Sequence, residues 1–94
     1  MRDDAQLIDE SLTGQSDSFG QLVQKYQDRL FNTMVYVTGS RKEAEDVVQN
    51  AFELAYVKRA KVAGNSEFCT WLYRIAFNIA VSRRQARRPA TDRK

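Results

Sequence analysis

The chain has no histidine, and Cys69 is the single cysteine among its 94 residues. Histidine is the usual general base near neutral pH and a common metal ligand, so its absence argues against triad catalysis and most metal centres. A lone cysteine forms neither an internal disulfide nor a thiolate zinc site, which favours a reducing, cytoplasmic compartment. We therefore expect no cofactor, no metal and no enzymatic activity.

Proline and glycine are also scarce, with one proline and four glycines. The glycines form no phosphate-binding motif, and apolar residues recur every three or four positions rather than every two. The longest apolar runs, residues 34–37 and 54–57, are far shorter than the roughly 18 residues that indicate a membrane span. These patterns predict a soluble, all-α protein folded as one small bundle of three to four helices.

Start and stop signals place four helices along the chain. They begin near residues 4, 16, 41 and 67 and end near residues 13, 37, 57–60 and 87, respectively. Asp3 or Asp4 is the expected cap of the first helix, and Ser40 with Glu43 forms a capping box for the third. Residues 61–66 (KVAGNS) are predicted to form a loop, with Ser66 as the cap of the last helix.

The apolar stripes of these helices define the expected core. Tyr73 and Phe77 are expected to lie outside the stripe of the last helix. The predicted buried residues are Ala5, Leu7, Ile8, Leu12, Phe19, Leu22, Val23, Tyr26, Leu30, Thr33 or Met34, Val37, Ala44, Val47, Val48, Ala51, Ala55, Phe68, Trp71, Leu72, Ile75, Ala76 and Ile79.

The net charge of +3 is unevenly distributed along the chain. Residues 1–53 carry five basic and ten acidic side chains, a net charge of −5, whereas residues 54–94 carry ten basic and two acidic ones, a net charge of +8. This polarity favours two different partners, with the basic half facing nucleic acid or an anionic membrane. An ordinary charge gradient without function is the alternative.

The polar faces of the last two helices carry residue types suited to binding. Arg74 and Asn78 flank Trp71, and further arginines follow one turn beyond, a combination suited to phosphates and unpaired bases. The alternative is that Trp71 is simply core and the arginines form a solvated helix end. For Trp71 alone, a place in the core or at its edge is favoured over a pure contact role. On the third helix, acids and amides beside Phe52 form a stripe that is either an interface or a solvated face. Acids in a first helical turn are better explained by capping than by catalysis.

Two stretches, residues 43–52 (EAEDVVQNAF) and 68–78 (FCTWLYRIAFN), resemble region 2 of bacterial sigma factors of the extracytoplasmic-function type. The opening LIDESLTGQSDSFGQLVQKYQDRLF resembles the start of the same family, so the resemblance covers about residues 4–88. It implies a domain over residues 1–88, followed by a linker or disordered tail over residues 89–94. Family members add a second, helix-turn-helix domain that contacts the minus-thirty-five element, so we expect this chain to be an isolated domain.

The resemblance implies a non-enzymatic subunit that binds a coiled coil of the core RNA polymerase β′ subunit. It further implies recognition of the promoter minus-ten element, capture of its non-template strand, and regulation by an anti-sigma factor. The implied polymerase-binding residues, with the neighbouring stripe, are Asp46, Gln49, Asn50, Phe52 and Glu53. The implied DNA-binding residues, with the adjoining arginines, are Lys61, Val62, Gly64, Asn65, Ser66, Trp71, Arg74, Asn78, Ser82, Arg83 and Arg84.

Three of these positions depart from the family pattern. Asn50 stands where the family usually has an acid, Val62 where it frequently has phenylalanine, and Ser82 where it commonly has aspartate. Two other functions stay open from the residues alone. One is a basic helical module that binds RNA or an anionic surface without sequence preference through residues 83–88, and the other is a helical adaptor that uses only the acidic face.

Overall fold

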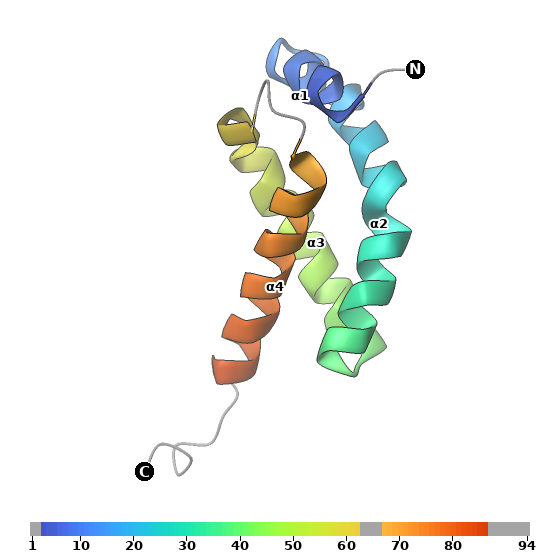
Figure 1. The fold of residues 1–94 in the computed structure, drawn as a ribbon, viewed down its shortest axis with the longest axis vertical. Coiled ribbons are helices and arrows are strands. Elements are labelled where there is room, and N and C mark those ends of the chain that lie inside the picture. Colours follow the sequence, from blue (N-terminus) through green and yellow to red (C-terminus); the bar gives the residue numbers. More distant parts are fainter. Residues whose placement is uncertain (1–2, 63–66, 87–94) are drawn as a thin grey trace.

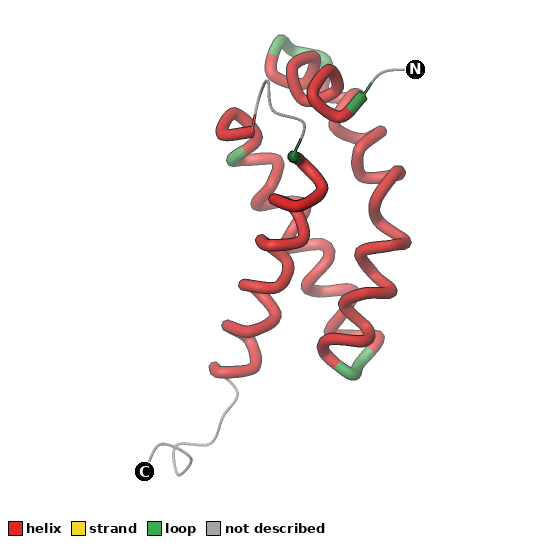
Figure 2. Tube along the Cα trace, in the orientation of Figure 1, coloured by secondary structure: helices red, strands yellow, loops and turns green. Residues whose placement is uncertain are grey.

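The computed structural model describes residues 3–62 and 67–86. It contains α1 (Asp4–Leu12), α2 (Ser16–Thr38), α3 (Arg41–Val57), the 3₁₀ turn η1 (Arg59–Val62) and α4 (Phe68–Ala86). Within these ranges there is no strand, as Figure 2 shows. The predicted all-α bundle is confirmed, and each α-helix begins and ends close to its predicted position. The predicted domain end at residue 88 and the cap Ser66 lie outside the described residues.

The helices are arranged around α2 and α3. Figure 1 shows α2 and α4 as two long helices, with α3 passing behind them and α1 lying across one end. The helix α2 packs against α1, α3 and α4, and α3 packs against α4 as well. Because α3 contacts both long helices, its side chains border two separate clefts.

The helix ends follow the capping signals of the sequence. The Asp3 side chain accepts a hydrogen bond from the Gln6 backbone N–H, and the Gln6 side chain accepts one from the Asp3 N–H, which completes a capping box. Ser40 accepts from the Glu43 N–H at 3.2 Å. Gly39 ends α2 in the left-handed conformation at φ 74°, and its N–H donates to the Val35 carbonyl.

Two glycine substitutions of α2 are expected to have opposite effects on stability. Gly39 has a positive φ and no atom near the place of an added Cβ, so Gly39→Ala introduces backbone strain of about 1 kcal/mol without a clash. Gly20 lies inside the same helix with equally open space, so Gly20→Ala stabilises by about 0.5–1 kcal/mol. Urea unfolding measures both changes, and destabilisation by Gly20→Ala would contradict the open helical environment.

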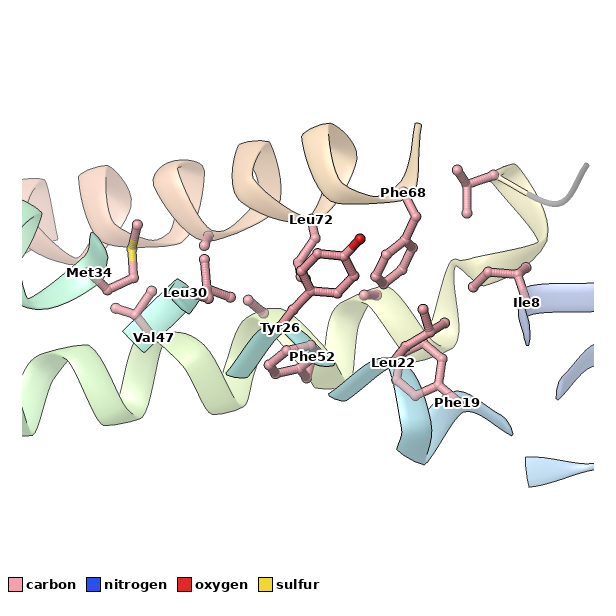
Figure 3. Close-up of a cluster of buried hydrophobic side chains, with 14 of the residues drawn as sticks. Ile8, Phe19, Leu22, Tyr26, Leu30, Met34, Val47, Phe52, Phe68 and Leu72 are labelled. Atoms are coloured by element: carbon pink, nitrogen blue, oxygen red, sulfur yellow. The ribbon is translucent and has the colours of Figure 1, made fainter. Parts of the chain in front are cut away.

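The core is a single cluster centred on Phe68, whose side chain is fully buried. Figure 3 shows Phe68 and Leu72 of α4 facing Tyr26 of α2 and Phe52 of α3. The Phe68 ring centroid lies 5.8 Å from that of Tyr26 and 6.3 Å from that of Phe19. These contacts hold the first turn of α4 against α2, and they thereby fix the direction in which α4 crosses α3.

Hydrogen bonds to Tyr26 and Lys25 attach α1 to α2. Asp4 accepts from the Tyr26 hydroxyl and from Lys25 Nζ, the latter at 2.8 Å. Burial of the ring, together with the hydrogen bond and the charge of Asp4, raises the pKa of Tyr26 well above its ordinary value. The Tyr26 hydroxyl therefore keeps its proton, and the bond to Asp4, at physiological pH.

Several burial predictions were wrong in detail. Leu12 is 40% exposed, because the adjacent Ser11 faces inward and takes its place against η1. Tyr73 was expected outside the stripe but packs partly buried against the core, and Ala80 is buried although it was not predicted. The other departures are partial exposure of residues expected to be buried, namely Ala5, Val23, Val37, Val48, Ile75 and Ile79. Trp71 is partly buried, which agrees with its expected place in or at the edge of the core.

The predicted loop over residues 61–66 was wrong at its start, because η1 continues the helical path to Val62. Arg59 holds this turn in place. Its guanidinium donates to Ser11 Oγ at 3.0 Å and to the Tyr56 carbonyl at 2.6 Å, and it stacks on the Tyr56 ring at 3.9 Å. Val62 is only 4% exposed and packs in the core beneath the turn. Sequence spacing alone could not show that Arg59 reaches back to α1.

Candidate protein and nucleic-acid interfaces

The helix α3 separates two surfaces because its buried residues occupy a narrow stripe. Val47, Ala51 and Ala55 are fully buried, and each lies four residues from the next. This spacing keeps one line of small side chains in the core while the polar residues on either side remain accessible. Two grooves result, one against α2 and one against α4.

The first groove, between α2 and α3, is acidic and has a volume of about 660 Å³. Four carboxylates and a single guanidinium line it. The Arg41 guanidinium lies 5.3 Å from the centroid of the Phe31 ring, where it closes one end of the groove with a cation–π contact. The residues of this acidic groove are Val23, Gln27, Asp28, Phe31, Arg41, Glu45, Asp46, Val48, Gln49, Phe52 and Glu53.

The acidic groove combines an apolar floor with a charged rim. Phe52 is nearly buried, and Val23, Phe31 and Val48 are partly buried beside it. An apolar centre with a polar rim is the usual anatomy of a protein interface. The carboxylates favour a partner segment that carries cations around an apolar strip.

The second groove, between α3 and α4, is basic and has a volume of about 550 Å³. Four cations line it, and no carboxylate is present among its described lining residues. An aromatic ring, an amide and a hydroxyl accompany these cations, so the groove offers both phosphate-binding and base-binding groups. The residues of this basic groove are Leu54, Lys58, Lys61, Trp71, Arg74, Ile75, Asn78, Ile79, Ser82 and Arg83.

Trp71 serves both the core and the basic groove. Its side chain is partly buried, and its ring centroid lies 6.0 Å from that of Phe68 at an interplanar angle of 52°. The same residue lines the groove together with Arg74 and Asn78. A ring that is fixed on one side by packing loses little rotational freedom when a base stacks on its exposed face.

Most of the predicted polymerase-binding residues meet in the acidic groove. Asp46, Gln49, Phe52 and Glu53 all line it. Asn50 is exposed on α3 but does not line this groove. The structure therefore supports a common surface for four of the five predicted residues, and it leaves Asn50 beside that surface.

The predicted DNA-binding residues divide into three groups. Those that line the basic groove are Lys61, Trp71, Arg74, Asn78, Ser82 and Arg83. Arg84 is exposed on α4 but lies outside this groove. Val62 offers almost no side-chain surface, because it is buried under η1, which corrects its prediction as a side-chain contact. Gly64, Asn65 and Ser66 lie outside the described residues.

Sequence reasoning missed several residues that line the two grooves. Asp28 and Arg41 join the acidic groove, and Lys58 with Leu54 forms the α3 wall of the basic groove. Leu54 and Lys58 are four residues apart, so helical spacing already placed them on one face. What the sequence did not show was that this face lies opposite Trp71 and Asn78.

One ion pair crosses from α3 to α4 between the two grooves. Arg83 Nη2 donates to Asp46 Oδ2 at 3.4 Å, and both side chains are partly exposed. The Arg83 Nε atom is buried without a hydrogen-bond partner. Asp46 lines the acidic groove and Arg83 lines the basic groove. A substitution at either residue therefore removes a contact made by a residue of the other groove.

In the described part of the chain, no group of three or more histidine, cysteine, aspartate or glutamate side chains is arranged to hold a metal ion. None of its helices combines the length and apolar character that crossing a membrane requires.

Known proteins resemble this chain over most of its length. The chain is 38% identical over 76 residues to the ECF RNA polymerase sigma factor SigW of Bacillus subtilis, which covers 81% of this chain and 41% of that protein. It is 40% identical over 84 residues to the RNA polymerase sigma-H factor of Pseudomonas aeruginosa, which covers 89% of this chain and 44% of that protein. It is 38% identical over 92 residues to the ECF RNA polymerase sigma-E factor of Haemophilus influenzae, which covers 95% of this chain and 48% of that protein.

The chain thus spans less than half the length of these curated relatives. The family model described as Sigma-70 region 2 matches residues 22–89, which include most of α2, all of α3 and α4, and both grooves. This match confirms the resemblance that residues 43–52 and 68–78 indicated. The chain belongs to the sigma-70 region 2 family.

Proposed function

We propose that the chain is a sigma-factor domain that binds core RNA polymerase and recognises and melts the promoter minus-ten element in transcription initiation. The observation that supports this most strongly is the pair of grooves with opposite charge on either side of α3. One domain can then hold a protein partner and a nucleic acid at the same time. Its relatives carry names of RNA polymerase sigma factors, which supports the same assignment.

In this proposal the acidic groove receives the coiled coil of the polymerase β′ subunit. Asp46 and Glu53 attract cations of the coiled coil, Gln49 offers an amide, and the half-covered apolar floor around Phe52 receives its apolar side chains. Asn50 contributes from the rim. The role requires no catalysis, so the domain acts as a binding subunit of a cytoplasmic transcription complex. An anti-sigma factor that covered either groove would block this complex.

The basic groove receives the non-template strand of the melted minus-ten element. Lys61, Arg74 and Arg83 pair with backbone phosphates, and a base stacks against Trp71. Asn78 offers an amide that donates to and accepts from a base edge, so it is the proposed source of sequence preference. Extruding a base costs a few kcal/mol of stacking and pairing energy, which these contacts must recover.

We predict that Asn78→Ala combined with Arg74→Ala weakens capture of the promoter strand by the complex of this chain with core polymerase. Loss of one base-edge contact and one phosphate contact should cost about 1–3 kcal/mol, which is about five- to 150-fold in affinity. Selection from a randomised single-stranded DNA pool, followed by anisotropy titration of the selected strand, measures this loss.

Gln85→Ala is the matched control, because Gln85 is an exposed amide of the same helix that lies outside the basic groove. It should leave strand affinity unchanged. If the two α4 variants bind the strand equally well, the basic groove is not the strand site. If the wild type selects no sequence and its binding falls steeply with salt, the non-specific RNA or anionic-surface function is favoured instead.

A further inference from the structure

The ion pair between Asp46 and Arg83 connects the two proposed binding sites directly. Each partner belongs to a different groove, and the two atoms Arg83 Nη2 and Asp46 Oδ2 lie 3.4 Å apart. Because the Asp46 carboxylate already binds Arg83, it attracts an incoming cation less strongly. Because the Arg83 guanidinium already binds Asp46, it likewise attracts an incoming phosphate less strongly.

The geometry of this pair is far from ideal. Charge-assisted hydrogen bonds between nitrogen and oxygen are usually about 2.7–2.9 Å long, so a contact of 3.4 Å is weak. The Arg83 Nε atom is buried and has no acceptor, which leaves one donor of the guanidinium unsatisfied. A phosphate group presents several acceptor oxygens and can bind a guanidinium through two parallel hydrogen bonds. A phosphate therefore offers the Arg83 guanidinium stronger hydrogen bonds than the single 3.4 Å contact with Asp46.

We propose that the Asp46–Arg83 pair couples the two grooves as a mutually exclusive contact. While Asp46 holds Arg83, the basic groove lacks one of its four cations for binding an anion. When a cation of a docked protein engages Asp46, Arg83 is released and turns to a phosphodiester in the basic groove. This inference rests on the proposed function for the identity of the two partners, but the coupling itself needs only a cationic protein and a nucleic-acid phosphate.

The coupling is reciprocal and modest. Because binding free energies are linked, a phosphate that takes Arg83 frees Asp46 for the protein partner to the same degree. The side chains of Arg83 and Asp46 are 35% and 44% exposed, so water and salt screen their attraction. Exposed ion pairs of this kind change an equilibrium by about two- to fivefold, which sets the expected size of the effect.

The test measures binding of a fluorescein-labelled single-stranded oligonucleotide of mixed sequence to the 94-residue chain without polymerase. Asp46→Asn should raise the affinity about two- to fivefold over the wild type, since it frees Arg83. Glu45→Gln is the matched control, because it removes the same charge from the neighbouring position of the same groove. Titrations at about 0.15 M salt, where charges are screened beyond about 8 Å, limit the effect of net charge alone.

Glu45→Gln should raise the affinity for the oligonucleotide by less than half as much as Asp46→Asn does. Adding Arg83→Gln to Asp46→Asn should abolish the increase in affinity. Three results would each overturn the coupling: an equal increase in affinity for the two acid variants, an increase that persists when Arg83→Gln is added, or no increase with Asp46→Asn. Absence of any oligonucleotide binding by the Asp46→Asn chain would overturn it as well. The proposed function fails on a different result, namely unchanged strand capture by the polymerase complex carrying Asn78→Ala and Arg74→Ala.

Discussion

Replacing Phe68 with alanine is expected to destabilise the protein strongly. The Phe68 side chain is fully buried, and its ring contacts the rings of Phe19, Tyr26 and Trp71. Large-to-small substitution of a buried phenylalanine costs about 3–5 kcal/mol, because it removes apolar burial and leaves a cavity. Native domains are stable by only about 5–15 kcal/mol, so this loss is a major part of the total.

Thermal unfolding followed by circular dichroism measures this effect. For a domain of this size each kcal/mol lowers Tm by about 4–8 °C, so Phe68→Ala should lower Tm by about 12 °C or more. Phe77→Ala is the matched control, because Phe77 lies on the same helix and is 41% exposed. That variant should shift Tm by only a few degrees. Similar shifts for the two variants would contradict the placement of α4 on the core.

The helices were predictable because their signals are local. Ser40 and Glu43 stand three residues apart, and the Ser40 side chain accepts from the Glu43 N–H at the start of α3 as predicted, whereas the Ser40 N–H donates to Thr38 Oγ1. Gly39 follows the apolar stripe of α2 and ends it in the left-handed conformation. Such contacts lie within one helical turn, so residue types and spacing are sufficient to infer them.

The grooves were only partly predictable, because they depend on how the helices pair. Trp71, Arg74 and Asn78 share one face of α4, and that much follows from helical spacing. The opposite wall comes from Lys58 at the end of α3, which is distant in sequence. Its position depends on the packing of α3 against α4, and no single-helix pattern contains that information.

The sequence was least informative where a long side chain makes a distant contact. Arg59 binds Ser11 across the bundle and thereby turns part of a predicted loop into η1, with Val62 buried beneath it. Arg83 was predicted as a phosphate ligand, and the structure pairs it with Asp46 of the opposite surface. Flexible cations reach many acceptors, so spacing alone does not select the one that they bind.

Substitutions in the acidic groove are expected to weaken binding to core polymerase. Asp46→Arg combined with Gln49→Ala should weaken binding to core polymerase, because it places a cation and a truncated side chain where we propose that the β′ coiled coil docks. Breaking a charge pair that is covered by an interface costs about 2–5 kcal/mol, which corresponds to a loss of about thirtyfold or more in affinity. Gln49 is exposed, Asp46 is partly exposed, and the Asp46–Arg83 pair that the substitution breaks is weak, so helicity should be retained.

Two controls separate docking from general charge effects. Asp9→Arg makes the same charge reversal at an exposed position of α1 outside both grooves, and it should leave polymerase binding within about twofold of the wild type, since isolated surface charges contribute little. The Arg74→Ala, Asn78→Ala variant changes the basic groove alone. It should keep its affinity for core polymerase while it loses the promoter strand.

If the two grooves have separate partners, the affinity of these chains for core polymerase depends on the acidic groove and not on the basic groove. A titration of labelled wild-type and variant chains with core polymerase, with helicity checked by circular dichroism, is the required measurement. The assignment of separate partners predicts a loss of about thirtyfold or more for Asp46→Arg with Gln49→Ala and an unchanged affinity for Arg74→Ala with Asn78→Ala. An unchanged affinity for the acidic-groove variant, or an equal loss for both variants, would contradict it.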